Sequence, residues 1–135
     1  MKIVSIALLI LVALGAAACV GSWLRNPAVI RELQEEPDGE RARKVMLLTL
    51  PSGKAIPVNY IQDPGVVYAA ADFPWWRELR EPAPVTVLVQ GQTLRGQGRA
   101  VLDEPELRTP VFERLRPTAP SWTGTLIEIR LDPQE

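Results

Sequence analysis

The chain has 135 residues and a formal net charge of −1, with no histidine and a single cysteine, Cys19. It therefore has no Ser-His-Asp triad, no Cys-His pair and no histidine-based zinc site, and one cysteine excludes a disulfide within the chain. The near-zero charge, without a long basic run, argues against a nucleic-acid-binding protein. We expect no metal site, so carboxylates or a bound cofactor must carry any chemistry.

The first 24 residues form a hydrophobic segment. Residues Ile3 to Trp23 carry no charge, and as a helix they would be about 31 Å long, which matches the roughly 30 Å hydrocarbon core of a bilayer. We therefore expect residues 1–24 to be a single-pass membrane anchor, with Trp23 at the interface. Two alternatives stay open, a lipoprotein signal with a lipid on Cys19 and a cleaved secretory signal. The sequence leaves open on which side of the membrane the rest of the chain lies.

Residues 25–42 are predicted to form a short helix and a linker. Asn26-Pro27 suits a helix start, and Pro37-Asp38-Gly39 is typical of a stop. One apolar stripe at helical spacing consists of Val29, Ile30 and Leu33. We interpret this helix as a spacer that lies against the domain or the membrane surface.

Residues 43–135 are typical of a mainly β domain. Strands are predicted over residues 45–50, 55–61, 66–71, 85–89, 93–102 and 123–131, and short helices over residues 72–80 and 104–116. Pro57 predicts a sheet edge or a bulge, because proline has no N–H for the ladder. Gly96 and Gly98 predict a bend or bulge in the fifth strand. The pattern predicts a mainly β, α+β fold, a six-stranded antiparallel split β-barrel that hides its strand edges.

Three stretches of this domain resemble the deazaflavin-dependent nitroreductase and quinone reductase family. They are VMLLTLPSGK followed by IPVNY (residues 45–60), WWRELREP followed by PVTV (residues 75–87), and GQTLRGQGRA (residues 91–100). Their order and spacing are similar to those of the family, and the resemblance covers roughly residues 43–133. It implies a split β-barrel that binds a deazaflavin or a flavin such as FMN, and that reduces nitroaromatics or quinones by hydride transfer.

The residues of a candidate cofactor site follow from this resemblance and from residue chemistry. The turn Ser52-Gly53-Lys54 offers a hydroxyl, backbone amides and an ammonium group to a phosphate, and Lys44, near the start of the first strand, adds positive charge. Trp75 and Trp76 point about 100° apart on a helix, so one can pack on the barrel while the other meets the cofactor ring. The predicted cofactor-binding residues are Lys44, Ser52, Gly53, Lys54, Pro57, Asn59, Trp75 and Trp76.

The neighbours Asn59 and Tyr60 face opposite sides of one strand. If Asn59 faces the cavity, it is placed to hydrogen-bond the cofactor ring. If Tyr60 faces the cavity instead, it is the candidate proton donor, and we take it as the predicted catalytic residue. The other candidate residues also have purely structural interpretations. The Ser52-Gly53-Lys54 turn could be an ordinary hairpin turn, Lys44 could belong to a solvated basic pair with Arg43, and Trp75 and Trp76 could be core aromatics.

The sequence thus predicts a membrane-tethered oxidoreductase that uses a reduced deazaflavin or FMN to reduce a nitro or quinone-type acceptor. The expected partners are the membrane, the small-molecule cofactor and a lipophilic acceptor, but no nucleic acid. Glu78 stands where the family usually has asparagine, and residues 110–115 lack the family's tyrosine, which favours a non-catalytic cofactor-binding module as an alternative. A lipidated Cys19 would favour an envelope lipoprotein of the same fold. The choices between deazaflavin and FMN, and between monomer and homodimer, stay open.

Overall fold

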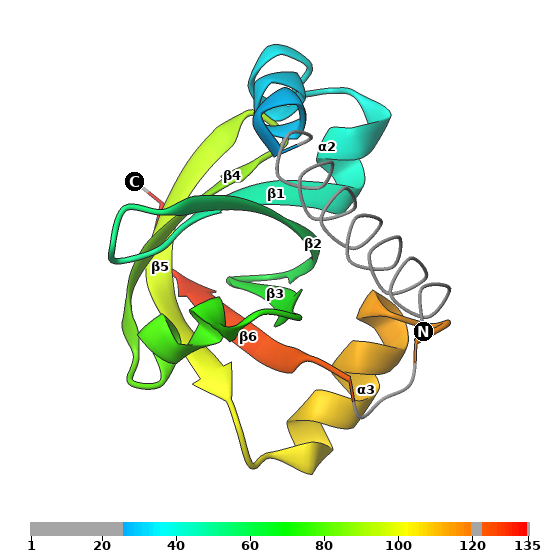
Figure 1. Ribbon diagram of the computed structural model, residues 1–135, viewed down its shortest axis with the longest axis vertical. Coiled ribbons are helices and arrows are strands. Elements are labelled where there is room, and N and C mark those ends of the chain that lie inside the picture. The colour runs from blue at the N-terminus through cyan, green and yellow to red at the C-terminus, as the bar shows by residue number, and fades with distance from the viewer. Residues whose placement is uncertain (1–25, 120–122, 135) are drawn as a thin grey trace, which may run out of the picture.

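The computed structural model describes residues 26–119 and 123–134 (Figure 1). The predicted anchor or signal, including Cys19 and its proposed lipid, lies outside the described residues. Within the described ranges, no helix is both long and apolar enough to cross a membrane.

Six antiparallel strands close into a barrel in the spatial order β1-β2-β3-β6-β5-β4 (Figure 1). The strands are β1 (Val45–Thr49), β2 (Ala55–Asp63), β3 (Val66–Ala71), β4 (Ala83–Val89), β5 (Gln92–Val101) and β6 (Thr125–Leu131). All six predicted strands are confirmed, and their ends differ from the prediction by at most two residues. The barrel closes because β1 pairs with β4 and β3 pairs with β6, in addition to the hairpins between sequence neighbours.

The helices differ from the prediction at the start of the domain. Residues 26–35 are helical, η1 (Pro74–Leu79) is a 3-10 helix, and α3 (Pro105–Leu115) is an α-helix that continues through Pro110. A further helix, α2 (Glu40–Lys44), was not predicted. Lys44 therefore ends a helix and does not open the first strand. Glu40 in the first turn of α2 and basic residues in its last turn complement the helix dipole.

The barrel interior is filled by alternate residues of the strands. The fully buried side chains of this cluster include Met46, Leu48, Val67, Val87, Ile127 and Ile129. Because successive strand residues point to opposite faces, the residues between them point outward. Two outer clusters form where helices cover these outward residues.

The two outer clusters lie on opposite sides of the barrel (Figure 1). Below α3, Tyr68 and Leu126 pack against Phe112. Below residues 26–35, Leu33 packs with Leu47 of β1, and the predicted apolar stripe faces this cluster. The prediction that this helix lies against the domain is therefore confirmed.

A bend or a bulge was predicted at Gly96 and Gly98, and the bulge is not found there. The register of β5 with β6 runs through both without interruption. A Cβ atom at Gly96 would lie 2.4 Å from the backbone oxygen of Arg130, and one at Gly98 would lie 3.2 Å from Leu79 of η1. Both glycines therefore allow a close approach of neighbouring atoms, which is the other common reason for glycine in a strand.

The ladder between β2 and β3 is incomplete, and this splits the barrel. Only residues 60–63 of β2 pair with β3, whereas residues 55–59 pair with β1 alone. The N–H of Leu50 donates to the carbonyl of Lys54 at 2.9 Å. Since hydrogen-bonded pairs alternate along an antiparallel ladder, the backbone groups of residues 55, 57 and 59 point away from β1. Pro57, which has no N–H, therefore lies at a free edge of β2, and this confirms the prediction of a sheet edge.

Candidate functional site

A cavity of about 610 Å³ opens along the free edge of β2. Its volume lies within the range of small-molecule sites, roughly 300–1,000 Å³. One wall is residues 55–59 of β2, and another is formed by the end of β3 and by residues that lead into η1. The remaining lining residues are Asn26, Pro27, Ile30, Lys54 and Arg116. The cavity therefore lies where the barrel is split, with the start of the described chain at its rim.

Four of the predicted site residues line this cavity, namely Lys54, Pro57, Asn59 and Trp75. Asn59 is exposed on the outer side of β2, as expected for the residue that alternates with a buried Tyr60. Trp75 is half-buried, and it contacts the barrel interior as well as the cavity. The structure thus brings an ammonium group, an amide and an indole to one site.

The Ser52-Gly53-Lys54 turn borders the cavity, but its donors already have a partner. The backbone N–H of Ser52 donates to Oε1 of Glu78 at 3.0 Å, and the Ser52 hydroxyl donates to Oε2 of the same carboxylate at 3.0 Å. Gly53 adopts a positive φ of 88°, which favours glycine in this turn. A phosphate at these donors would have to replace the Glu78 carboxylate.

Tyr60, Trp76 and Lys44 lie away from the cavity lining. Tyr60 points into the barrel, is 8 % exposed, and donates a hydrogen bond from its hydroxyl to the carbonyl of Ala42 at 3.0 Å. Gln90 donates to the same hydroxyl at 3.3 Å. The phenol therefore joins β2 to α2, and its catalytic role stays a prediction.

Trp76 has a different environment from Trp75. It packs against the interior cluster, and the guanidinium groups of Arg77 and Arg80 lie 5.9 and 5.4 Å from its ring centroid. Lys44 is exposed, and its ammonium lies 3.7 Å from Glu40 one turn earlier. Of the two tryptophans, only Trp75 is thus placed to meet a ligand ring.

The cavity lining also contains residues that were not predicted, among them Asp72, Phe73 and Arg116. Arg116 donates to both carboxylate oxygens of Asp72 at 2.7 Å, which is a bidentate ion pair. Phe73 is 72 % exposed. Asp72 and Arg116 are far apart in the sequence, so no local pattern could have joined them.

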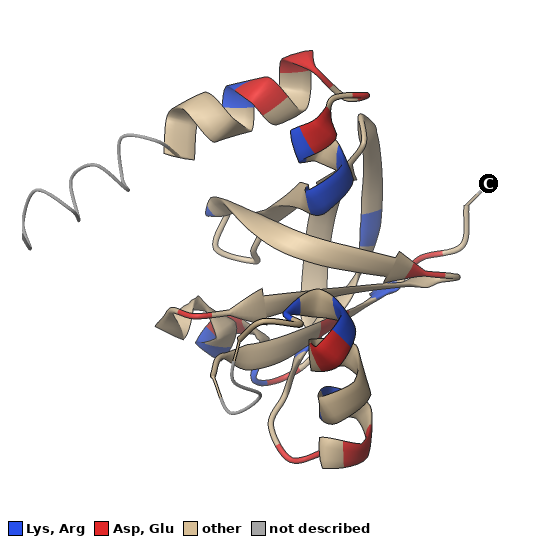
Figure 2. Ribbon diagram, turned by 90° about the vertical axis from the view of Figure 1, so that its right-hand side faces the viewer, with Lys and Arg blue, Asp and Glu red and all other residues tan. Residues whose placement is uncertain are grey.

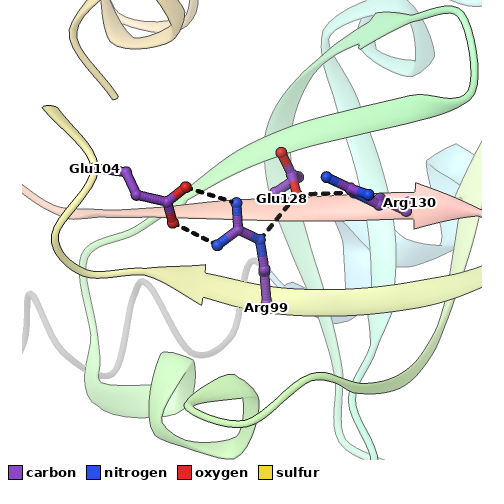
Figure 3. A network of polar contacts seen from close by, with 4 residues as sticks. All are labelled: Arg99, Glu104, Glu128 and Arg130. Atoms are coloured by element: carbon purple, nitrogen blue, oxygen red, sulfur yellow. Dashed lines mark hydrogen bonds and ion pairs between the residues drawn. The ribbon is translucent and has the colours of Figure 1, made fainter. Parts of the chain in front are cut away.

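The outer face of β5 and β6, next to the start of α3, carries a polar network around the buried Glu128 (Figure 3). Glu128 is 5 % exposed and accepts from Arg99 at 2.9 Å and from Arg130 at 3.3 Å. Arg99 also binds both oxygens of Glu104, directly before α3, and this contact lowers the pKa of the Glu104 carboxyl. Similarly, the hydrogen bond that Arg114 of α3 donates to the Asp63 carboxylate lowers the pKa of that carboxyl group. These contacts hold α3 on the barrel.

Charged residues lie mainly on helices and loops, and three of the six strands, β1, β3 and β4, carry none (Figure 2). Among the described residues, no group of three or more Asp, Glu, His or Cys side chains is arranged to hold a metal ion. The cavity offers an indole, an amide, apolar side chains and two cations as its binding groups, and it also contains the Asp72 carboxylate, which is paired with Arg116.

The chain is similar in fold to solved structures, among them a protein from Listeria innocua provisionally described as a pyridoxamine 5'-phosphate oxidase. The TM-score is 0.53 at 21 % sequence identity, and the match covers 67 % of this chain and 85 % of the other. No protein-family model matches the chain, and no curated protein matches it. At this identity the likeness shows the barrel fold.

Proposed function

We propose that the protein is an oxidoreductase that binds FMN or a deazaflavin in the cavity along the free edge of β2. The observation that carries the proposal is the cavity itself, a split in the barrel walled by Trp75 and the edge of β2 and flanked by Lys54. The fold neighbour is named as an oxidase, and the sequence resembles a family that reduces nitro compounds and quinones. When bound, the cofactor supplies the hydride chemistry.

The residues of the chain would bind and orient this cofactor. Trp75 offers an aromatic face to a flat ring, since aromatic pairs prefer stacked or edge-to-face contacts. Asn59 offers an amide that can both donate and accept hydrogen bonds. Lys54 and Arg116 supply positive charge, although Arg116 is already paired with Asp72.

A fluorescence titration of the full chain in detergent with FMN and with a deazaflavin, separately, tests this proposal. We expect micromolar binding of one of them, and Trp75→Leu should weaken it about tenfold, because the stacked ring is lost while apolar packing remains. Leu102→Ser is the control, since Leu102 is an exposed apolar residue outside the cavity lining. Binding of neither cofactor would refute the proposal.

We further propose that the N-terminal segment holds this cavity at a membrane and that the acceptor is lipophilic. Asn26, Pro27 and Ile30 line the cavity, and Trp23 precedes Asn26 by three residues, which span at most about 11 Å when fully extended. If residues 1–24 span the bilayer, the cavity therefore opens close to its surface, where a quinone or nitro-type acceptor dissolves.

Alkaline extraction of membranes that contain the full chain tests the tether. A membrane-spanning segment keeps the protein in the membrane fraction, and Cys19→Ser leaves this unchanged. If Cys19→Ser releases the protein, the anchor is a lipid on that cysteine. Release of the unaltered protein would contradict both forms of the tether.

A non-catalytic cofactor-binding module is the second candidate function. The specific observation in its favour is that Tyr60, the predicted proton donor, does not line the cavity. A cofactor that binds tightly, but is not turned over with quinone or nitroaromatic acceptors, would favour this alternative.

A further inference from the structure

We propose that the Ser52-Gly53-Lys54 turn is an anion-binding site whose resident occupant is the chain's own Glu78 carboxylate, which a phosphate-bearing ligand must displace. Glu78 would then set how strongly the cavity prefers a phosphorylated ligand over the same ligand without phosphate. The part of the inference that concerns the cofactor rests on the proposed function. The anion site itself does not.

The geometry of the contact is that of an anion held by two donors. Both oxygens of Glu78 are used, one by the backbone N–H and the other by the hydroxyl of Ser52, each at 3.0 Å. The N–H of Lys54 points at the same hydroxyl at 3.4 Å. A backbone amide and a hydroxyl are also groups that bind phosphate in proteins. The carboxylate thus occupies donors that suit a phosphate.

The contact is open to solvent, so an incoming anion can reach it. The contact is exposed, with Ser52 exposed and Glu78 half-buried, and exposed charged contacts contribute little to stability. A Cβ atom built on Gly53 would have no other atom within 4 Å, which leaves open space beside the turn. Displacement of the Glu78 carboxylate therefore requires no rearrangement of the barrel interior.

Two separate observations place the turn next to the cavity. Lys54 belongs to the turn and also lines the cavity. Trp75 and Glu78 are three residues apart on the 3-10 helix η1, and residues at this spacing lie on the same side of such a helix. A ligand with its ring against Trp75 can therefore place a phosphate at the Ser52 donors.

The charge of Glu78 makes the site selective. A phosphate brings negative charge next to the carboxylate, and like charges at short distance repel each other. A ligand without phosphate does not meet this repulsion. We therefore expect the unaltered protein to bind FMN and riboflavin with similar affinity, and removal of the carboxylate to favour FMN.

The decisive experiment titrates inorganic phosphate into the full chain in detergent by calorimetry, with the unaltered protein, Glu78→Ala and Glu81→Ala. Glu81→Ala is the matched control, because it removes the same charge three residues away and no described contact joins Glu81 to the turn. We expect Glu78→Ala to bind phosphate at least about tenfold more tightly, and Glu81→Ala to change affinity less than about twofold. No gain in Glu78→Ala, or an equal gain in Glu81→Ala, would overturn the proposal.

Two additions keep this test decisive. Glu78→Gln removes the charge but keeps a side chain of the same size, so it replaces Glu78→Ala if that variant does not fold. The ratio of FMN to riboflavin affinity, measured in the same proteins, should rise about tenfold with loss of the carboxylate. If FMN, riboflavin and the deazaflavin all fail to bind to any variant, the proposed function fails, while the phosphate titration still decides whether the turn is an anion site.

Discussion

The two sides of the barrel are held together by different kinds of contact. Below α3, the outer face of β3, β5 and β6 is closed by arginine–carboxylate pairs, with Glu128 buried among them (Figure 3). On the cavity side, β2 has a free edge. The contacts near it are the hydrogen bonds of Tyr60, the exposed bond between Ser52 and Glu78, and the exposed ion pair between Arg116 and Asp72.

This difference shows where the chain can accept a ligand. A buried ion pair is costly to break, since removal of one partner leaves the other charge without compensation. Exposed or neutral hydrogen bonds can be exchanged at small cost. We therefore expect changes on the α3 side to affect stability, and changes at the cavity rim to affect binding.

The largest effect is expected for Arg99→Met. This change removes the main partner of Glu128. Arg130 compensates only in part, because its Nε lies 3.3 Å from Oε1 of Glu128, whereas the Nε of Arg99 lies 2.9 Å from the same oxygen. We expect a loss of about 3 kcal/mol in the free energy of unfolding, measured by urea denaturation. Arg130→Met, at a residue whose side chain is 77 % exposed, should cost clearly less. Equal losses in the two variants would mean that the network does not depend on Arg99.

A smaller effect is expected for Tyr60→Phe, on the cavity side. The change removes the donor to the carbonyl of Ala42, a buried residue, and should cost about 1 kcal/mol in the free energy of unfolding. Tyr68→Phe is a suitable control, because no hydrogen bond of the Tyr68 hydroxyl is found among the described residues. If Tyr60 is also the proton donor, Tyr60→Phe abolishes turnover while cofactor binding persists, and unchanged turnover would exclude that role.

The smallest effect is expected for the exposed pair of Asp63 and Arg114. Arg114 lowers the pKa of the Asp63 carboxyl in the folded state, so this contact stabilises the fold above the ordinary carboxyl pKa of about 4 and is lost as the pH falls through the lowered value. We expect Arg114→Gln to lower Tm slightly at pH 6. The difference from the unaltered protein should shrink as the pH approaches 3. A difference that is constant over this range would show that the pair does not contribute through its charges.

Much of the fold could be predicted from local patterns. Runs of β-branched and apolar residues, separated by turns such as the one at Gly53, predicted the strands, because strand formation and turn chemistry depend on neighbouring residues. The predicted edge at Pro57 was also local, since it follows from a missing N–H. A bulge, one of the two alternatives predicted at Gly96 and Gly98, was wrong, because glycine in a strand also allows close packing, and the sequence does not distinguish a bulge from close packing.

The candidate site was predicted only in part. Lys54, Asn59 and Trp75 were named from their chemistry, and all three line the cavity. The sequence could not show that Glu78 occupies the turn at Ser52, because these residues meet only when η1 folds back onto the first hairpin.

By itself, the sequence determined the strands, the absence of histidine chemistry and the apolar N-terminal segment, since each depends on composition or on neighbours along the chain. The tertiary structure decided which faces are covered, where β2 leaves β3, and which donors already have partners. These features depend on pairs such as Arg116 and Asp72, whose side chains are 44 positions apart in the sequence. Such pairs form only when the closed barrel brings the ends of its strands together, so the shape of the cavity belongs to the fold as a whole.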